Sequence, residues 1–164
     1  MQILNQRQIR QKIKRLAIEI LENNYEAPEI YLLGINNRGY SFAQMLLEEL
    51  NHITRIPIIL TRLRLDPAAP LESSIQLEMD ASHLENKTIL IVDDVANTGR
   101  TIFYAFKTIL DILPNKVQIA VLVDRKHKTF PVHVDYVGIS LATTLKENID
   151  VQILAEEEPA VFLN

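Results

Sequence analysis

The chain has 164 residues, of which 48% are hydrophobic, and this fits one globular domain with a substantial core. It contains no cysteine, which excludes disulfides, thiol nucleophiles and zinc–thiolate sites and makes a reducing cytoplasm the expected location. With 17 basic and 21 acidic residues the net charge is -4, so the chain as a whole has no electrostatic attraction to nucleic acid.

The amino-terminal half of the chain predicts two helices and two strands. It begins without the apolar core of a signal peptide, and no apolar run is long enough to cross a membrane. Hydrophobic residues recur at three- and four-residue spacing after Asn5, a residue type that often caps a helix. The predicted elements are a helix that starts after Asn5 and ends near residues 23–24, a strand over 29–35, a helix over 42–53 and a strand over 56–65.

The rest of the chain predicts further strands that alternate with helical sequence. Residues 66–74, with Pro67 and Pro70, form a predicted exposed loop, and residues 75–79 alternate as a half-buried strand does. Later strands are expected over 88–92, 117–123, 134–139 and 149–154, with a helical stretch that ends before Pro114. Such alternation requires crossover connections, so the predicted fold class is α/β, a mostly parallel central sheet flanked by helices. Its active site should lie at the carboxyl ends of the strands.

The strongest chemical signal is a carboxylate pair at the end of the strand that begins near Thr88. Four apolar residues precede Asp93 and Asp94, which places both acids at the edge of the sheet where ligands bind. Adjacent carboxylates repel each other unless a polar or cationic group lies between them. Sugar hydroxyls or a magnesium ion would satisfy both side chains.

A turn that can hold a phosphate follows the acid pair and opens a helix. Gly99 allows close backbone approach, and the hydroxyls of Thr98 and Thr101 can donate to phosphate oxygens. Backbone N–H groups at the start of a helix also favour an anion. Contacts to a diol, followed within a few residues by a phosphate cradle, describe a ribose 5-phosphate, and the residues expected to bind it are Asp93, Asp94, Val95, Ala96, Asn97, Thr98, Gly99, Arg100 and Thr101.

Three other interpretations account for parts of this segment. It can be a strand that ends in acids, followed by a helix that Thr98 merely caps. A phosphoacceptor receiver domain also carries an acid pair after an apolar strand, but that pair lies near the start of the chain, whereas this one lies past the middle. A P-loop hydrolase is disfavoured because the chain has no GxxxxGK[ST] sequence.

Residues 89–101 resemble the signature of the type I phosphoribosyltransferases. Residues 34–39 are similar to the pyrophosphate loop of that family, and residues 121–125 and 135–138 are similar to later segments of one branch. That branch is the bifunctional pyrimidine operon attenuation protein / uracil phosphoribosyltransferase family, and the similarity covers nearly the whole chain. The resemblance implies a single phosphoribosyltransferase domain over residues 1–164, with a small hood built from the amino-terminal and carboxyl-terminal portions.

The resemblance also implies a reaction and a set of site residues. The 5-phosphoribosyl group of PRPP (5-phosphoribosyl-1-pyrophosphate) would pass to a nucleobase, with uracil giving UMP and pyrophosphate. Mg²⁺ would bind mostly through the substrate beside Asp93 and Asp94, and the enzyme would form a homodimer or a higher homo-oligomer. The implied catalytic residues are Asp93, Asp94 and Arg38, the pyrophosphate would be held by Asn36, Asn37, Arg38 and Gly39, and the base would be bound by Asp124, Arg125 and Ile149.

Two functional alternatives remain open at this point. One is an attenuator that binds pyrimidine-operon RNA, although the acidic net charge, and His133 and Ile139 at positions where relatives are basic, weaken it. The other is a pocket that binds PRPP without turnover. Residues 126–128 can contact phosphates or form a charged surface turn, and residues 66–74 can form a lid or a plain connection. The acidic run 156–158 is expected to be a solvated segment.

Overall fold

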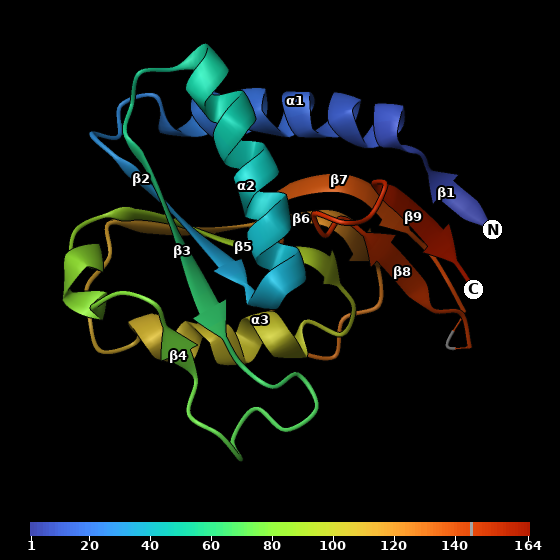
Figure 1. The fold of residues 1–164 in the computed structure, drawn as a ribbon. Coiled ribbons are helices and arrows are strands. Elements are labelled where there is room, and N and C mark those ends of the chain that lie inside the picture. Colours follow the sequence, from blue (N-terminus) through green and yellow to red (C-terminus); the bar gives the residue numbers. More distant parts are fainter. Residues whose placement is uncertain (145) are drawn as a thin grey trace.

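Two sheets and three α-helices make up the computed structural model, which describes residues 1–144 and 146–164. Figure 1 shows their arrangement. The elements are β1 (Gln2–Leu4), α1 (Gln6–Asn24), β2 (Ile30–Ile35), α2 (Asn36–Ile53), β3 (Ile58–Arg64), β4 (Gln76–Leu77), β5 (Thr88–Ala96), α3 (Arg100–Ala105), β6 (Lys116–Arg125), β7 (Tyr136–Leu141), β8 (Ile149–Gln152) and β9 (Ala160–Leu163), with short 3-10 helices at Ala81–Leu84 and Phe106–Ile109.

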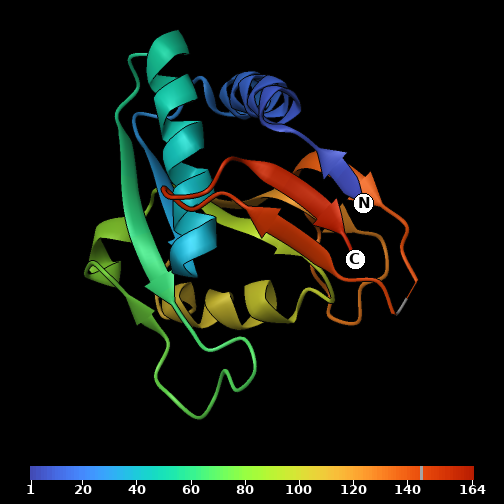
Figure 2. The ribbon, with the colours of Figure 1, turned by 45° about the vertical axis from the view of Figure 1, so that its right-hand side comes forward.

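The larger sheet has six strands in the order β4-β3-β2-β5-β6-β7. Five of them run parallel, and only β4 pairs antiparallel, with the end of β3. Helices α1 and α2 lie on one face of this sheet and α3 lies on the other (Figures 1 and 2). The predicted α/β class and the mostly parallel sheet are therefore confirmed.

Alternate residues of the central strand β5 serve two cores. Leu90 and Val92 pack with α1 and α2, whereas Ile89 and Ile91 pack with α3, and all four side chains are fully buried. Each such side chain contributes roughly 1.5–3 kcal/mol of burial free energy. Because both faces of the strand are covered, its sequence is continuously apolar rather than alternating.

The capping residue predicted for the first helix is confirmed. The Asn5 side chain accepts a hydrogen bond from the Gln8 backbone N–H at 2.9 Å, and the Gln8 side chain accepts one from the Asn5 N–H at 2.9 Å, which completes a capping box. The helix ends at Asn24, as expected, where the Asn24 side chain donates to the Ile20 carbonyl at 2.8 Å.

A second, three-stranded antiparallel sheet in the order β1-β9-β8 forms the hood. The two ends of the chain meet there, because the Met1 ammonium donates to the Leu163 carbonyl at 2.7 Å and the Leu163 N–H donates to the Met1 carbonyl at 2.8 Å. The predicted hood of amino-terminal and carboxyl-terminal portions is confirmed. Strands β1 and β9 were not expected from the sequence, since each is only three or four residues long.

Several boundaries differ from the sequence-based expectations. Strand β5 continues through Ala96, so both aspartates belong to the strand rather than follow it, and β6 likewise includes Asp124 and Arg125. The strand expected over 75–79 is reduced to two residues, because only Gln76 and Leu77 reach β3. Among the described residues, no helix is long and apolar enough to cross a membrane.

Candidate active site

A pocket of about 460 Å³ opens where β2 and β5 end and α2 begins, at the carboxyl edge of the parallel sheet. The hood supplies its opposite wall. The residues that line it are Ile35, Asn36, Asn37, Arg38, Pro67, Asp93, Asp94, Val95, Asn97, Thr101, Ile149 and Leu154. The structure thus brings the predicted acid pair and three of the four predicted pyrophosphate residues to one cavity.

The acid pair lies at the floor of this pocket in a low-dielectric setting. Asp93 is only 7% exposed, and its Oδ1 atom accepts a hydrogen bond from the Asp94 N–H at 2.9 Å. Burial raises the pKa of the Asp93 carboxyl well above its usual value, and the neighbouring Asp94 raises it further. Burial also raises the pKa of Asp94, while hydrogen bonds and the charge of Arg38 partly oppose that rise. The pair is therefore suited to a cation or to hydroxyl donors.

Residues 36–39 form the first turn of α2, whereas the sequence had suggested a loop. Asn36 adopts a left-handed backbone conformation with φ of 53°, which asparagine tolerates better than most residues, and its side chain accepts a hydrogen bond from the Leu65 N–H at 3.1 Å. Gly39 does not line the pocket but lies against β5. A Cβ atom there would lie 2.8 Å from the Val92 carbonyl oxygen, so the close approach of α2 to β5 requires glycine.

The turn after β5 encloses a small hollow of about 50 Å³ next to the main pocket. Gly99 has φ of 86°, and the Thr98 carbonyl accepts hydrogen bonds from the N–H groups of Thr129 at 3.0 Å and Phe130 at 3.1 Å. The Arg100 guanidinium donates to the carbonyl of Pro67, which ties the turn to the loop after β3. The lining residues are Val95, Ala96, Asn97, Thr98, Gly99, Arg100, Thr101 and Ile102.

A comparison with known families matches residues 1–156 to the phosphoribosyl transferase domain. This chain belongs to the phosphoribosyltransferase family. Bifunctional protein PyrR of Bacillus pumilus (strain SAFR-032) is 33% identical over 163 residues, covering 92% of this chain and 89% of the relative. Bifunctional protein PyrR of Streptomyces coelicolor (strain ATCC BAA-471 / A3(2) / M145) is 38% identical over 156 residues, covering 89% and 79%. The resemblance seen in the sequence is confirmed.

Solved structures of phosphoribosyltransferases share the fold of this chain. A hypoxanthine phosphoribosyltransferase of Trypanosoma cruzi superposes with a TM-score of 0.79 at 19% identity, covering 98% of this chain and 94% of that one. A hypoxanthine-guanine phosphoribosyltransferase of Bacillus anthracis gives 0.79 at 16% identity, covering 100% and 96%. The phosphoribosyltransferase fold is therefore shown.

The residues expected to bind the base are only partly brought to the pocket of this phosphoribosyltransferase. Ile149 lines it, but Asp124 forms an ion pair with Lys128 at 2.5 Å, with both side chains at most 20% exposed. Arg125 donates instead to the Thr143 hydroxyl and to the carbonyls of Thr144 and, at 2.8 Å, Glu147. Both side chains thus serve contacts within the phosphoribosyltransferase fold.

Sequence reasoning missed three lining residues and one partner of the site. Ile35, Pro67 and Leu154 line the pocket although none carries a chemical signal, and each could be found only as a neighbour of a predicted element. Glu157 lies in the run expected to be solvated, but it is half-buried and faces Arg38, with 3.9 Å between Arg38 Nη2 and Glu157 Oε1. Within residues 1–144 and 146–164, no three histidine or acidic side chains gather to hold a metal.

Proposed function

We propose that this phosphoribosyltransferase transfers the 5-phosphoribosyl group of PRPP to a nucleobase, with uracil as acceptor and UMP and pyrophosphate as products. One observation carries the proposal: the pocket of the acid pair and the hollow of the phosphate turn share Val95, Asn97 and Thr101. A single molecule can therefore contact both, as a ribose 5-phosphate would. Uracil is the acceptor that the sequence resemblance implies.

In the proposed reaction a nitrogen of the base attacks C1 of the ribose while the bond from C1 to the pyrophosphate oxygen breaks. The nitrogen loses its proton to water, and no protein nucleophile is needed because the leaving group is already a stabilised anion. Asp93 and Asp94 hold the ribose hydroxyls and steady the positive charge that develops on the ring. Arg38 neutralises the departing pyrophosphate, and the turn at residues 95–101 fixes the 5-phosphate. Positioning and electrostatic stabilisation supply the rate.

Mg²⁺ fits the chemistry of the acid pair. Carboxylate oxygens are the ligands that this ion prefers. Burial opposes ionisation of both aspartates, as the raised pKa of each shows, and a cation beside them would offset that cost. Among the described residues two carboxylates, Asp93 and Asp94, line this pocket, so the ion would take its other ligands from water and from PRPP. When bound, it would supply charge neutralisation for the pyrophosphate.

Turnover tests the proposal directly. The protein is incubated with PRPP, Mg²⁺ and each of uracil, hypoxanthine, guanine, adenine, xanthine and orotate, and pyrophosphate release is measured. We expect Asp94→Asn to lower kcat strongly without loss of folding, and Arg38→Ala to raise KM for PRPP. The exposed Asp111→Asn is the control for loss of one negative charge. The assignment would be contradicted if pyrophosphate were released without any base present, or if both variants turned over as fast as the wild type. If the protein bound PRPP but released no pyrophosphate with any of the bases, it would be a donor-binding regulator.

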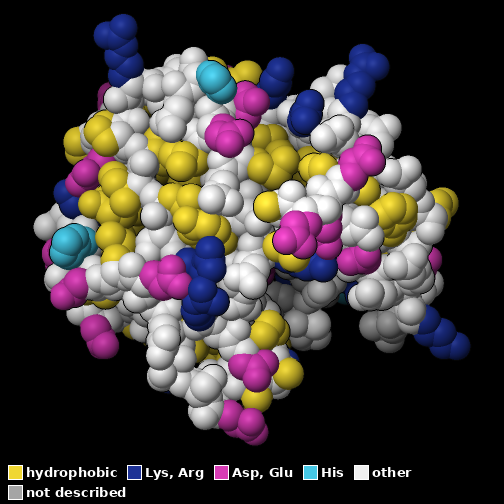
Figure 3. Space-filling view, in the orientation of Figure 1, with side chains coloured by type: hydrophobic (Ala, Val, Ile, Leu, Met, Phe, Trp, Pro, Cys, Tyr) yellow, Lys and Arg dark blue, Asp and Glu magenta, His cyan; other side chains and the backbone are white. Residues whose placement is uncertain are grey.

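RNA is a second candidate partner, and the outer face of α1 favours it. Arg10 and Lys14 line two surface hollows, of about 300 and 380 Å³. Arg7 joins them in the smaller one, whereas Glu48 and Glu49 line the larger one and oppose the approach of phosphates there. On the face drawn in Figure 3, however, basic and acidic side chains are interspersed. A leader RNA of a pyrimidine operon should bind with an affinity that falls steeply with salt.

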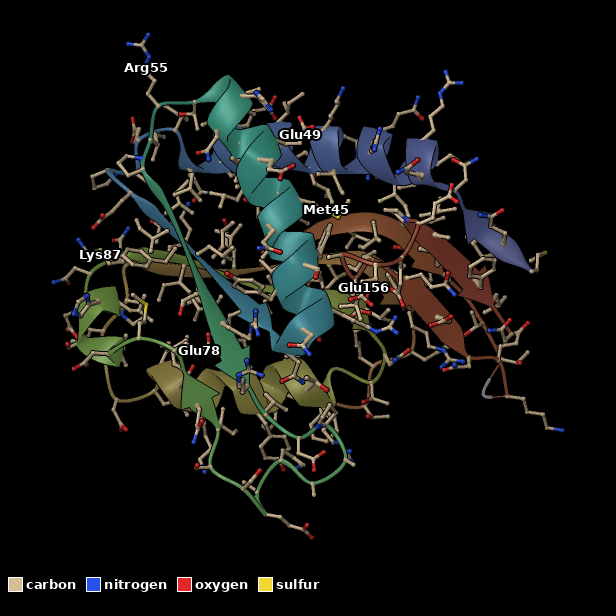
Figure 4. The ribbon with its side chains drawn as sticks, viewed as in Figure 1. Met45, Glu49, Arg55, Glu78, Lys87 and Glu156 are labelled. Carbon is tan, nitrogen blue, oxygen red and sulfur yellow. The ribbon has the colours of Figure 1, made fainter. Side chains whose placement is uncertain are left out.

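The matched RNA test uses charge removals at two places. Lys14→Gln should reduce the slope of log affinity against log salt by about 1, as loss of one phosphate contact does. Arg55→Gln removes the same charge from an exposed position at the far end of α2 (Figure 4) and should leave the slope unchanged. Equal effects of both variants, or no binding at low salt, would exclude a specific RNA surface on α1.

The remaining parts of the proposal concern the context of the enzyme. We propose that residues 1–164 act as one domain, that the protein works in the cytoplasm, and that it forms a homodimer or a higher homo-oligomer. The sequence resemblance supports all three. Light scattering over a range of concentrations would test the oligomeric state.

A further inference from the structure

Arg38, the cation proposed to receive pyrophosphate, is held by the hood. Its Nη1 atom lies 3.5 Å from Asp150 Oδ1 and also donates to the Val151 carbonyl, both on β8. Its Nη2 atom lies 3.9 Å from Glu157 Oε1, on the segment between β8 and β9. Figure 4 shows Glu156, the neighbour of Glu157, beside α2, so this segment approaches the helix that carries Arg38.

Both hood carboxylates are fixed by partners of their own. The Oδ2 atom of Asp150 accepts a hydrogen bond from the Gln152 side chain at 3.3 Å, and Oε2 of Glu157 accepts one from the Leu154 N–H at 2.9 Å. In each carboxylate one oxygen accepts this local hydrogen bond, and the other oxygen faces Arg38. The acids are therefore oriented toward the guanidinium by their surroundings, which lowers the entropic cost of holding it.

A guanidinium has a limited number of donors, and those that face the hood are engaged there. Arg38 also lines the pocket, where the proposed pyrophosphate would need the same N–H groups. Pyrophosphate carries several negative charges and each of the two hood carboxylates carries one, so the ligand and the acids compete for the same cation. A pyrophosphate that draws the guanidinium toward the pocket would therefore weaken its ion pairs with Asp150 and Glu157, and these pairs would re-form when the ligand leaves.

We infer that Asp150 and Glu157 are positioning residues that act through Arg38: they weaken the grip on pyrophosphate and so assist its release. The inference rests on the proposed function, because it assigns Arg38 to the pyrophosphate. Neither carboxylate touches the reacting atoms. Both are part of the hood, so a strand more than 100 residues away in sequence tunes the affinity of the first turn of α2.

Titration calorimetry with inorganic pyrophosphate and Mg²⁺ tests the inference without requiring turnover. Asp150→Asn and Glu157→Gln keep shape and hydrogen-bonding capacity but remove the competing charge. Exposed or half-exposed ion pairs are weak, so each variant should bind pyrophosphate about two- to fivefold more tightly than the wild type. Damage to the fold would weaken binding instead, so a gain separates the proposed role from a structural one.

The control is Glu156→Gln, which removes an exposed carboxylate from the same segment without a contact to Arg38. It should change the affinity by less than either test variant. In an Arg38→Ala background the effect of Asp150→Asn should disappear, because the residue through which it acts is gone. Equal tightening by Glu156→Gln, or tightening that persists without Arg38, would attribute the effect to general electrostatics and overturn the inference.

Steady-state kinetics add a second readout. If the acids assist release, both variants should lower KM for PRPP, strengthen inhibition by pyrophosphate and lower kcat wherever release limits turnover. The outcomes separate the two proposals. Pyrophosphate binding that depends on Arg38 but is unchanged in both acid variants overturns only the inference. A folded wild-type protein that does not bind pyrophosphate overturns the proposed function and the inference together.

Discussion

Replacing Asp93 with asparagine should make the ligand-free protein more stable at neutral pH while it abolishes most turnover. Asparagine has the same shape, and its side-chain oxygen can still accept the hydrogen bond from the Asp94 N–H. It differs in carrying no charge. The wild-type carboxylate is 7% exposed beside a second carboxylate, so its ionisation in the folded state is opposed by burial first and by Asp94 second.

The sign and size of the effect follow from proton linkage. Because the pKa of Asp93 is raised in the folded state, that state binds more protons than the unfolded chain, and the free energy of unfolding falls as pH rises. As pH rises, this decrease in the free energy of unfolding begins near the pKa of aspartate in the unfolded chain, about 3.9, and ends near the raised pKa of Asp93 in the folded state. Each unit of difference costs about 1.4 kcal/mol, or about 3–6 °C in Tm for a protein of this size. Asp93→Asn removes this cost.

Urea unfolding of both proteins between pH 4 and pH 8 measures the difference. The two should be similar near pH 4, and the variant should become progressively more stable as pH increases. The surface variant Asp111→Asn should change the free energy of unfolding by no more than about 0.5 kcal/mol at any pH. A variant that is less stable than the wild type at pH 8, or a difference that does not depend on pH, would refute the reasoning about the buried pair.

Three further predictions concern the surroundings of the pocket. Gly39→Ala places a Cβ 2.8 Å from the Val92 carbonyl oxygen, so thermal unfolding should show a free energy of unfolding lower by about 1–3 kcal/mol. The rate of pyrophosphate formation should also fall, because α2 carries Arg38. A variant as stable as the wild type would contradict the close packing of α2 on β5. Glycine at position 36 tolerates φ of 53° but cannot accept the hydrogen bond from the Leu65 N–H, so Asn36→Gly should raise KM for PRPP with little loss of stability. Asn36→Ala should raise KM for PRPP and also lower the free energy of unfolding, because alanine does not favour that φ. Lys128→Met leaves Asp124 without its ion pair, and urea unfolding should show a cost of about 1–3 kcal/mol, which the double variant with Asp124→Asn should largely restore.

The parts of the fold that could be predicted are those with a strong local pattern. The first helix was found with its cap because Asn5 precedes a long run of helical spacing. Strand β5 was found because it is buried on both faces, although its end was placed too early, since aspartate is uncommon within strands. Strands β1 and β9 were missed because such short segments become strands only by pairing with each other across the whole chain.

In the site, too, residue spacing could predict only features whose residues are close together in the sequence. The order of Asp93, Asp94 and Gly99 was visible because strand, acids and turn are consecutive in the sequence. The contacts of Arg38 with the hood were not, because they join residues that are 112–119 positions apart, and spacing carries no information about them. Asp124 was assigned to the base from resemblance alone, and its pairing with Lys128 depends on how the segment after β6 folds back.

The attachment of the Thr98 carbonyl to residues 129 and 130 has a consequence for engineering. The thirteen residues from Ile89 to Thr101 do not carry all the partners of their own backbone, because two N–H groups from a later segment complete the turn. Transplanting those thirteen residues into another parallel sheet would thus leave the Thr98 carbonyl without its hydrogen-bond donors, and the turn would have no contact to fix its conformation. A working graft would need the return segment as well, so the smallest transferable unit spans β5, α3, β6 and the residues through 130.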